Sequence, residues 1–206
     1  IGRGLTYDGP ALLAAIAEGV KQATLEHPLR SSVCHPIDRT NPQTNTGQRI
    51  PMIDVEFLEA SGYVELKMMP KGSGSENMSF LKMLTPADGI EGVKSWILEC
   101  IETAGPDACP PLIAGVGVGG TFEKAAILSK KALFREIGGP NPDQTLDALE
   151  RELLEKANRL GIGPQGYGGD TTAFGIHILT YPCHITSLPV AVTIECHAHR
   201  HKEAIL

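Results

Sequence analysis

Cysteines arranged for a disulfide framework are missing from this 206-residue chain. Its five cysteines are an odd number, and no two of them stand in a CxxC arrangement. Thiols that stay free or bind a metal are typical of a reducing compartment, whereas a disulfide framework is typical of secreted chains. We therefore expect a cytoplasmic location.

Long apolar runs and clusters of basic residues are also missing. No apolar stretch approaches the roughly 18 residues that a membrane-spanning helix needs, and no signal-peptide pattern is visible. The formal net charge of -6 and the lack of a Lys and Arg run argue against nucleic-acid binding. We expect neither a membrane nor a nucleic acid as a partner.

What the chain does contain is the composition of an ordinary globular protein, with 42% hydrophobic and 20% charged residues. A chain of this length buries a substantial core, and we expect one domain over residues 1–206. Helices and strands are interspersed without regular βαβ alternation, so we predict a mixed α/β (α+β) fold rather than a doubly wound sheet. Apolar periodicity predicts helices at 8–26, 90–103, 143–160 and from residue 121, and strands at 52–59, 63–69, 112–118, 174–180 and 189–196.

Two loops have the composition of functional segments. Residues 30–51 are polar, rich in Pro, Asn and Thr, and long for a connection inside a compact domain. Residues 70–79, PKGSGSENMS, combine small residues with one cation, and such loops let backbone N–H groups approach an anion closely. A flexible surface loop is the alternative for the second segment, and Cys34 in the first is interpreted as an incidental thiol.

A glycine-rich corner separates the predicted strand at 112–118 from the helix that follows it. Gly115, Gly117 and Gly120 satisfy the GxGxxG pattern by which dinucleotide-binding folds hold phosphate at a helix N-terminus. No second strand ending in an acidic residue follows about twenty residues later, as that fold requires. Close packing of the strand against its neighbours explains the same glycines, so both interpretations stay open.

Three histidines and two cysteines are candidate metal ligands. His197, His199 and His201 alternate, so in an extended segment they would share one face and bind zinc, unless they form a solvated tail. Cys109 precedes one predicted strand and Cys196 closes another, which suits iron–sulfur or zinc ligation. Two cysteines cannot hold a cluster alone. Residue chemistry therefore indicates an enzyme-like domain, with a non-catalytic metal- or nucleotide-binding module as the alternative.

Long ordered strings in the sequence resemble the iron–sulfur-dependent class I fumarases and their relatives, the L-tartrate dehydratases. The resemblance is to the α subunit of the two-subunit form, or to the corresponding N-terminal part of the single-chain form, and it covers essentially the whole chain. The strings that carry it are NTG at 45–47, PKGSGSENMSFLKML at 70–84, CPPLIAGVGVGGTFEKAAILSKKAL at 109–133, GIGPQGYGGDTTA at 161–173 and HITSLPVAVTIECHAHRH at 184–201.

The resemblance implies a hydro-lyase that interconverts fumarate and (S)-malate, a reaction of the tricarboxylic acid cycle. The alternative within the family is L-tartrate dehydratase, which forms oxaloacetate by the same mechanism. The family's 4Fe-4S cluster is held by three cysteines, and its fourth iron, free of protein ligands, binds the substrate and acts as a Lewis acid. We therefore expect a small dicarboxylate as substrate.

Cys109 and Cys196 match the second and third cluster ligands of the family, and the other cysteines are interpreted as structural or incidental thiols. The family's first cluster cysteine lies in a CQDTG motif upstream of the part that matches this chain. The chain starts at Ile1 without an initiator methionine, so we expect a trimmed N-terminus and a third cluster ligand upstream. We also expect a β subunit or C-terminal domain to complete the active site, in a homo- or hetero-oligomer, and the 206-residue chain alone to be inactive.

Three positions match residues that line the family's dicarboxylate site. Arg30 would pair with a substrate carboxylate, and Gly74 would offer a backbone contact. His184 would transfer or orient a proton and is the expected catalytic residue. Lys71 and Asn77 lie in the same loop as Gly74 and are predicted to bind substrate as well. The resemblance also favours the packing interpretation of the glycine corner.

Overall fold

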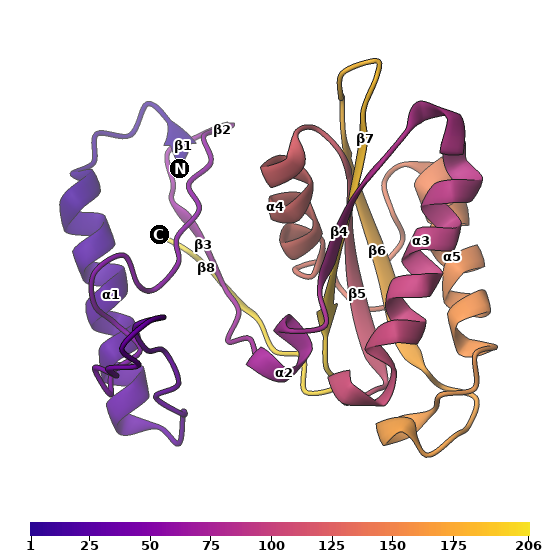
Figure 1. Cartoon of the computed structure of the whole chain (residues 1–206). Helices are drawn as coiled ribbons and strands as arrows, with labels where there is room; N and C mark the ends of the chain where they lie inside the picture. The colour runs from indigo at the N-terminus through magenta and orange to yellow at the C-terminus, as the bar shows by residue number, and fades with distance from the viewer. The chain divides into compact units, whose positions relative to one another are not determined.

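The computed structural model describes the backbone of residues 1–206 and every side chain except those of residues 60 and 61. The chain divides into two units, which are drawn in Figure 1. The first comprises Ile1–Leu66 with Glu203–Leu206, and the second comprises Lys67–Lys202. Helices and strands are mixed in both, so the predicted mixed α/β (α+β) class is confirmed. That residues 1–206 form one family domain stays a prediction.

The first unit is built on one long helix, α1 (Gly9–Glu26). Asp8 caps its start, because the carboxylate accepts a hydrogen bond from the backbone nitrogen of Ala11 at 3.1 Å. The helix ends at His27, whose extended backbone leaves the helical region. The helix predicted at 8–26 is therefore confirmed.

Short strands accompany this helix and differ in part from the prediction. The predicted strand at 52–59 is wrong over residues 52–57, where the backbone is irregular and most of the large apolar side chains stay exposed. An alternating pattern forms a strand only where one face is buried, which is not the case here. The strands are β1 (Gly2–Arg3), which pairs in parallel with β2 (Leu58–Ser61), and β3 (Glu65–Met68), which pairs with β8 (Lys202–Ile205).

The second unit is organised around a mixed sheet. Its strands follow the order β4-β7-β5-β6, with β5 parallel to β6 and β7 antiparallel to both β4 and β5. This topology is not that of a doubly wound sheet, in agreement with the prediction. The strands are β4 (Phe80–Leu84), β5 (Leu112–Gly119), β6 (Ala173–Tyr181) and β7 (Leu188–Glu195).

Helices cover both faces of this sheet. Figure 1 shows α3 and α5 on one face and α4 on the other, which makes three layers. Across the described residues, none of the helices combines the length and the apolar character needed to cross a membrane. The long helices are α3 (Gly89–Ala104), α4 (Phe122–Ala132) and α5 (Gln144–Asn158), and the short ones are α2 (Ser73–Glu76), η1 (Pro86–Asp88), η2 (Gly105–Ala108) and η3 (Pro164–Gly166).

The two faces of β5 are packed differently. On one face Val116 is fully buried in the apolar core that the sheet forms with α3 and α5. On the other face, a Cβ at Gly115 would overlap the carbonyl oxygen of Ser129, and one at Gly117 would overlap that of Ala125. Helix α4 approaches the strand so closely that only glycine fits, which supports the packing interpretation of the glycine corner.

Strand direction decides which residues share an edge of the sheet. Ile113 at the start of β5 pairs with Glu195 at the end of β7. The edge that precedes β5 and follows β7 carries Cys109 and Cys196, and we call it the cysteine edge. The opposite edge, where β5 ends at Gly119, is called the glycine edge. The eight residues of β5 separate the two edges by on the order of 25 Å.

A buried polar cluster binds backbone groups in the middle of β6, on the side of this edge strand that faces away from β5. Glu150 of α5 accepts a hydrogen bond from the backbone nitrogen of Ile178 at 2.7 Å, and the Asn141 amide donates to the Ile178 carbonyl oxygen at 3.2 Å. Arg135 pairs with both carboxylate oxygens of Glu150. Because these groups satisfy one another, a carboxylate that is only 6% exposed is accommodated next to an edge strand.

Candidate active site

Cys109 stands where η2 turns into β5 and has an unusual backbone conformation. Its φ of 54° and ψ of 65° are left-handed, which a residue with a side chain adopts at a cost of roughly 1 kcal/mol or more. Its carbonyl oxygen accepts a hydrogen bond from the backbone nitrogen of His197 at 3.2 Å and lies 3.1 Å from the ring Nδ1 of the same residue. These contacts to His197 fix an exposed cysteine in a conformation that few residues adopt.

Cys196 immediately precedes His197 and follows the last residue of β7. The His197 contact therefore places the two predicted cluster cysteines, 87 positions apart in sequence, at one edge of one sheet. Cys196 is partly buried, and its Sγ lies 3.9 Å from the carboxylate oxygen Oε1 of Glu195. The structure thus brings together the two residues that the sequence analysis predicted as metal ligands.

Gln165 is a site residue that the sequence analysis did not single out. Its backbone nitrogen and its side-chain amide both donate to the carbonyl oxygen of Pro110, at 2.9 and 3.2 Å. The same amide nitrogen lies 3.2 Å from Nδ1 of His197. Gln165 therefore links the glycine-rich loop at 161–172 to Pro110, which follows Cys109, and to His197, which follows Cys196. The only signal for it in the sequence is its place in the string GIGPQGYGGDTTA.

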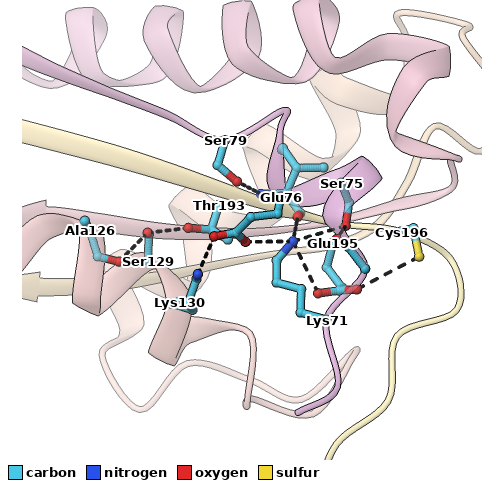
Figure 2. Close-up of polar contacts among 12 residues, drawn as sticks. Lys71, Ser75, Glu76, Ser79, Ala126, Ser129, Lys130, Thr193, Glu195 and Cys196 are labelled. Carbon is cyan, nitrogen blue, oxygen red and sulfur yellow. Dashed lines mark hydrogen bonds and ion pairs between the residues drawn. The ribbon is translucent and has the colours of Figure 1, made fainter. Parts of the chain in front are cut away.

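The loop at 70–79 also reaches the cysteine edge. Lys71 lies 10% exposed, and its ammonium donates to the carbonyl oxygen of Ile194 at 2.7 Å (Figure 2). Glu195 Oε2 is 3.7 Å from the same nitrogen. Gly74 and Asn77 belong to the turn that follows Lys71. Three of the predicted substrate-binding residues are therefore held next to the strand that leads into Cys196.

Two carboxylates in this region have pKa values shifted in opposite directions. Burial raises the pKa of Glu195, and the nearby Lys71 ammonium offsets this only in part. Burial also acts to raise the pKa of Glu76, but the hydrogen bond from Lys130 and the charge of Lys71 outweigh it and lower that pKa below its ordinary value. Glu76 is therefore an anion that two lysines hold, from the loop and from α4 (Figure 2).

His184 lies at the glycine edge, away from Cys109 and Cys196. Its Nδ1 is 2.8 Å from the hydroxyl of Thr186, and its side chain lines an open cleft of about 680 Å³ with Thr121, Lys124 and Tyr181. This cleft follows the ends of β5 and β6. Within one chain the structure therefore does not bring His184 together with the cysteine edge, and its catalytic role stays a prediction.

Arg30 belongs to the first unit, in the loop that follows α1. The NTG string organises this loop through Asn45, whose amide donates to the carbonyl oxygen of Arg30 at 2.9 Å. The Asn45 carbonyl in turn accepts from the backbone nitrogens of Ser32 and Val33, at 2.8 and 3.2 Å. The loop around Arg30 is thus shaped by its own hydrogen bonds, and the role of Arg30 in substrate binding stays a prediction.

The three terminal histidines do not converge on one point: His199 and His201 contact each other, whereas His197 faces Cys109. His197 contacts the Cys109 carbonyl, whereas Nδ1 of His201 lies 3.1 Å from Nε2 of His199 and its ring packs edge-on against Phe134. Among the side chains that the structure describes, no group of three or more His, Cys, Asp or Glu is arranged to hold a metal ion. The arrangement gives no support to the zinc alternative.

Sequence comparison identifies the family of this chain. The family model described as fumarate hydratase (fumerase) matches residues 1–205. The chain belongs to the fumerase family. The resemblance inferred from the sequence strings is thereby confirmed.

Curated relatives of this fumerase-family chain are α subunits. A putative L(+)-tartrate dehydratase subunit alpha from Methanocaldococcus jannaschii is 51% identical over 190 residues, which cover 92% of this chain and 67% of the relative. The L(+)-tartrate dehydratase subunit alpha from Escherichia coli K12 is 36% identical over 189 residues, which cover 92% of this chain and 62% of that relative. The chain thus spans about two thirds of the length of these relatives.

The cysteine edge of this fumerase-family chain fits an iron–sulfur cluster in part. Cys109 is exposed and Cys196 is partly buried. Cys109 precedes β5 and Cys196 follows β7, and the pairing of these two strands fixes the positions of both residues. Thiolates are the usual ligands of such clusters, so the two residues suit two of three ligand positions. A third thiol is needed in addition, and the described residues place none beside these two.

Proposed function

We propose that this chain is the α part of an iron–sulfur hydro-lyase that interconverts (S)-malate and fumarate. The observation that carries the proposal is the meeting of Cys109 and Cys196 at one edge of the sheet, fastened by the contacts of His197 to the Cys109 carbonyl. Membership of the fumerase family supports it. We further propose a cytoplasmic location, where the thiols stay reduced, and a role in the tricarboxylic acid cycle.

In this proposal Cys109 and Cys196 hold a 4Fe-4S cluster, with a third cysteine from outside residues 1–206. When bound, the cluster supplies an iron that polarises the hydroxyl group of the substrate for loss of water. The backbone nitrogens of Glu76 and Asn77 donate within the turn at 72–77, so the N–H groups at its start, around Gly74, are the donors that we propose for a carboxylate. A Cβ at Gly74 would meet no atom within 4 Å, which leaves space there for an incoming ligand. Asn77 presents an amide in the same turn, and Arg30 pairs with a substrate carboxylate.

The place of His184 has a consequence for the assembly. The two edges of the sheet are separated by on the order of 25 Å, and a small dicarboxylate is far shorter than this distance. If His184 handles the substrate proton, it therefore acts on substrate held at the cysteine edge of another copy of the chain. We propose that the complete enzyme is an oligomer of this kind, together with a β subunit or C-terminal domain.

The α-subunit names of the relatives favour a second candidate, L-tartrate dehydratase, which would form oxaloacetate with the same residues. Steady-state assays of the full-length protein with its partner subunit, on malate, fumarate and L-tartrate, separate the two. A kcat/KM for tartrate well above that for malate would replace our first choice with the second. An assembly that consumes none of these three compounds would contradict both candidate functions.

Cysteine variants in the same full-length assembly test the cluster. We expect Cys109→Ser and Cys196→Ser each to lose bound iron, visible absorbance and turnover, while Cys183→Ser at the glycine edge retains all three. Iron and turnover retained in both of the first two variants would remove the cluster from the proposal. Tight binding of a nicotinamide dinucleotide by the assembly would instead favour the nucleotide-binding interpretation of the glycine corner.

A further inference from the structure

The ammonium of Lys71 is surrounded by oxygens of the protein itself. An ammonium group carries three N–H donors. Its N–H groups donate to the Ile194 carbonyl at 2.7 Å and to the Ser75 hydroxyl at 3.1 Å. The same nitrogen forms ion pairs with Glu76 Oε2 at 3.1 Å and with Glu195 Oε2 at 3.7 Å. Since the side chain is only 10% exposed, these partners are not easily replaced by a ligand from solvent.

Ser75 and Glu76 belong to the turn at 72–77, whereas Ile194 and Glu195 belong to β7. Ser75 is 3% exposed and donates its own hydroxyl to the Gly72 carbonyl at 3.2 Å, which closes the turn. Glu76 is bound on its other side by Lys130 of α4. Ile194 lies in β7, two residues before Cys196, and its backbone nitrogen donates to the Ser79 hydroxyl at 3.3 Å. Figure 2 shows Lys71 at the centre of these contacts.

We propose that Lys71 is a positioning residue rather than a substrate ligand: it fastens the turn at 72–77 to the end of β7 that carries Cys196. The substrate-binding loop and a cluster ligand are thereby held as one rigid piece. The functional meaning of this inference rests on the proposed function, because that proposal assigns substrate binding to the turn. The fastening itself is a property of the chain without substrate or cluster.

Hydrogen–deuterium exchange on the substrate-free full-length assembly tests the fastening directly. We expect Lys71→Met to speed the exchange of the amides at 76–79 and 193–196 by about tenfold or more, because a charged, buried set of hydrogen bonds is lost. Amides of α5 should exchange as in the unchanged protein, which shows that the fold is intact. The control Lys156→Met, which removes a surface ion pair with Glu152, should leave the amides at 76–79 and 193–196 unaffected.

Glu76→Gln provides a second, milder variant should Lys71→Met not fold. It keeps the shape of the side chain but weakens its bonds to both lysines, so we expect faster exchange at the same amides, and less than additive effects in the double variant. In kinetics, both single variants should lower kcat and raise KM together. A Lys71→Met protein with unchanged exchange rates and a raised KM alone would overturn the inference in favour of direct substrate binding. If the assembly proves not to be a hydro-lyase, the exchange measurement still decides on the fastening.

Discussion

His197 contacts the carbonyl oxygen of Cys109 with both its backbone nitrogen and its ring, at 3.2 and 3.1 Å. The residue after one predicted cluster ligand thus holds the backbone of the other. The contact uses a carbonyl and leaves both thiols available to a metal. His197 is therefore a target for mutation.

His197→Ala should loosen the hold of the protein on its cluster. The ring contact to Cys109 and the bond to Gln165 are lost while both thiols remain, and residues that orient metal ligands typically contribute 10- to 100-fold in affinity. We expect iron to leave the full-length assembly at least about tenfold faster in the presence of a chelator. His201→Ala is the matched control, and equal rates of iron loss in the two variants would contradict the assignment.

Gly117→Ala should destabilise the second unit, because a Cβ there would overlap the Ala125 carbonyl of α4. Overpacking of this kind lowers the free energy of unfolding by roughly 1–3 kcal/mol. Because the overlap here is with backbone, which cannot rotate away, we expect a loss at the upper end of this range or above it. We expect a clearly lower Tm in thermal unfolding monitored by circular dichroism. Gly19→Ala, in α1 where a Cβ meets no atom within 4 Å, should leave the Tm unchanged or slightly raised.

Gly74→Ala should impair substrate binding without harming the fold. A Cβ at this position meets no protein atom within 4 Å, so the only group that it can obstruct is one that enters the turn from outside. We expect KM to rise about tenfold or more while the Tm stays close to that of the unchanged protein. A Gly74→Ala assembly with normal KM would show that the dicarboxylate does not approach this turn.

Mixing two inactive variants should restore activity if His184 acts across copies of the chain. Cys109→Ser and His184→Ala damage opposite edges of the sheet, so a mixed dimer retains one site with both an intact cysteine edge and an intact histidine. Random pairing of equal amounts gives about a quarter of the original turnover. Co-expressed variants that are no more active than each variant alone would place the two residues in separate functions.

Cys100 should be the slowest cysteine to react with iodoacetamide. Burial raises the pKa of its thiol to about 12, and only the thiolate reacts, so its reactive fraction at pH 8 is on the order of one in ten thousand. Peptide mass spectrometry of metal-free protein should find the exposed Cys109 and Cys183 modified well before Cys100. Because the folded pKa lies above the ordinary value of 9.0, this thiol favours the native state at lower pH, and that contribution is lost as the pH rises from about 9 toward 12. Equal modification of Cys100 and Cys183 in the folded protein would contradict the burial of Cys100.

The sequence correctly predicted those helices and strands whose periodic apolar residues are buried against a neighbouring element. Helix α1 was predictable from its Asp8 cap, and β5 from its apolar run, because local signals and tertiary packing agree there. Residues 52–57 alternate in the same way, yet their apolar side chains are largely exposed and no strand forms. Periodicity alone does not report whether a partner face exists.

The candidate site was predictable only in its metal ligands, and those through family resemblance. Lys71 was placed in the correct loop, but one of its acceptors, the Ile194 carbonyl, lies more than a hundred residues away in sequence, and no local pattern reveals it. Gln165 was missed for the same reason, since its significance lies in contacts with Pro110 and His197. Two candidates chosen by the same resemblance, Cys109 and His184, lie at opposite edges of the sheet.

The polar cluster on β6 bears on how copies of this chain can associate. Because Glu150 accepts from the Ile178 nitrogen and Asn141 donates to the Ile178 carbonyl, side chains already occupy both backbone groups of this residue in the middle of β6. A neighbour that docked there would have to separate a buried ion pair between Glu150 and Arg135. The cluster therefore opposes the pairing of another strand with β6 at Ile178, and covering an edge strand in this way is one means by which proteins avoid strand-mediated aggregation.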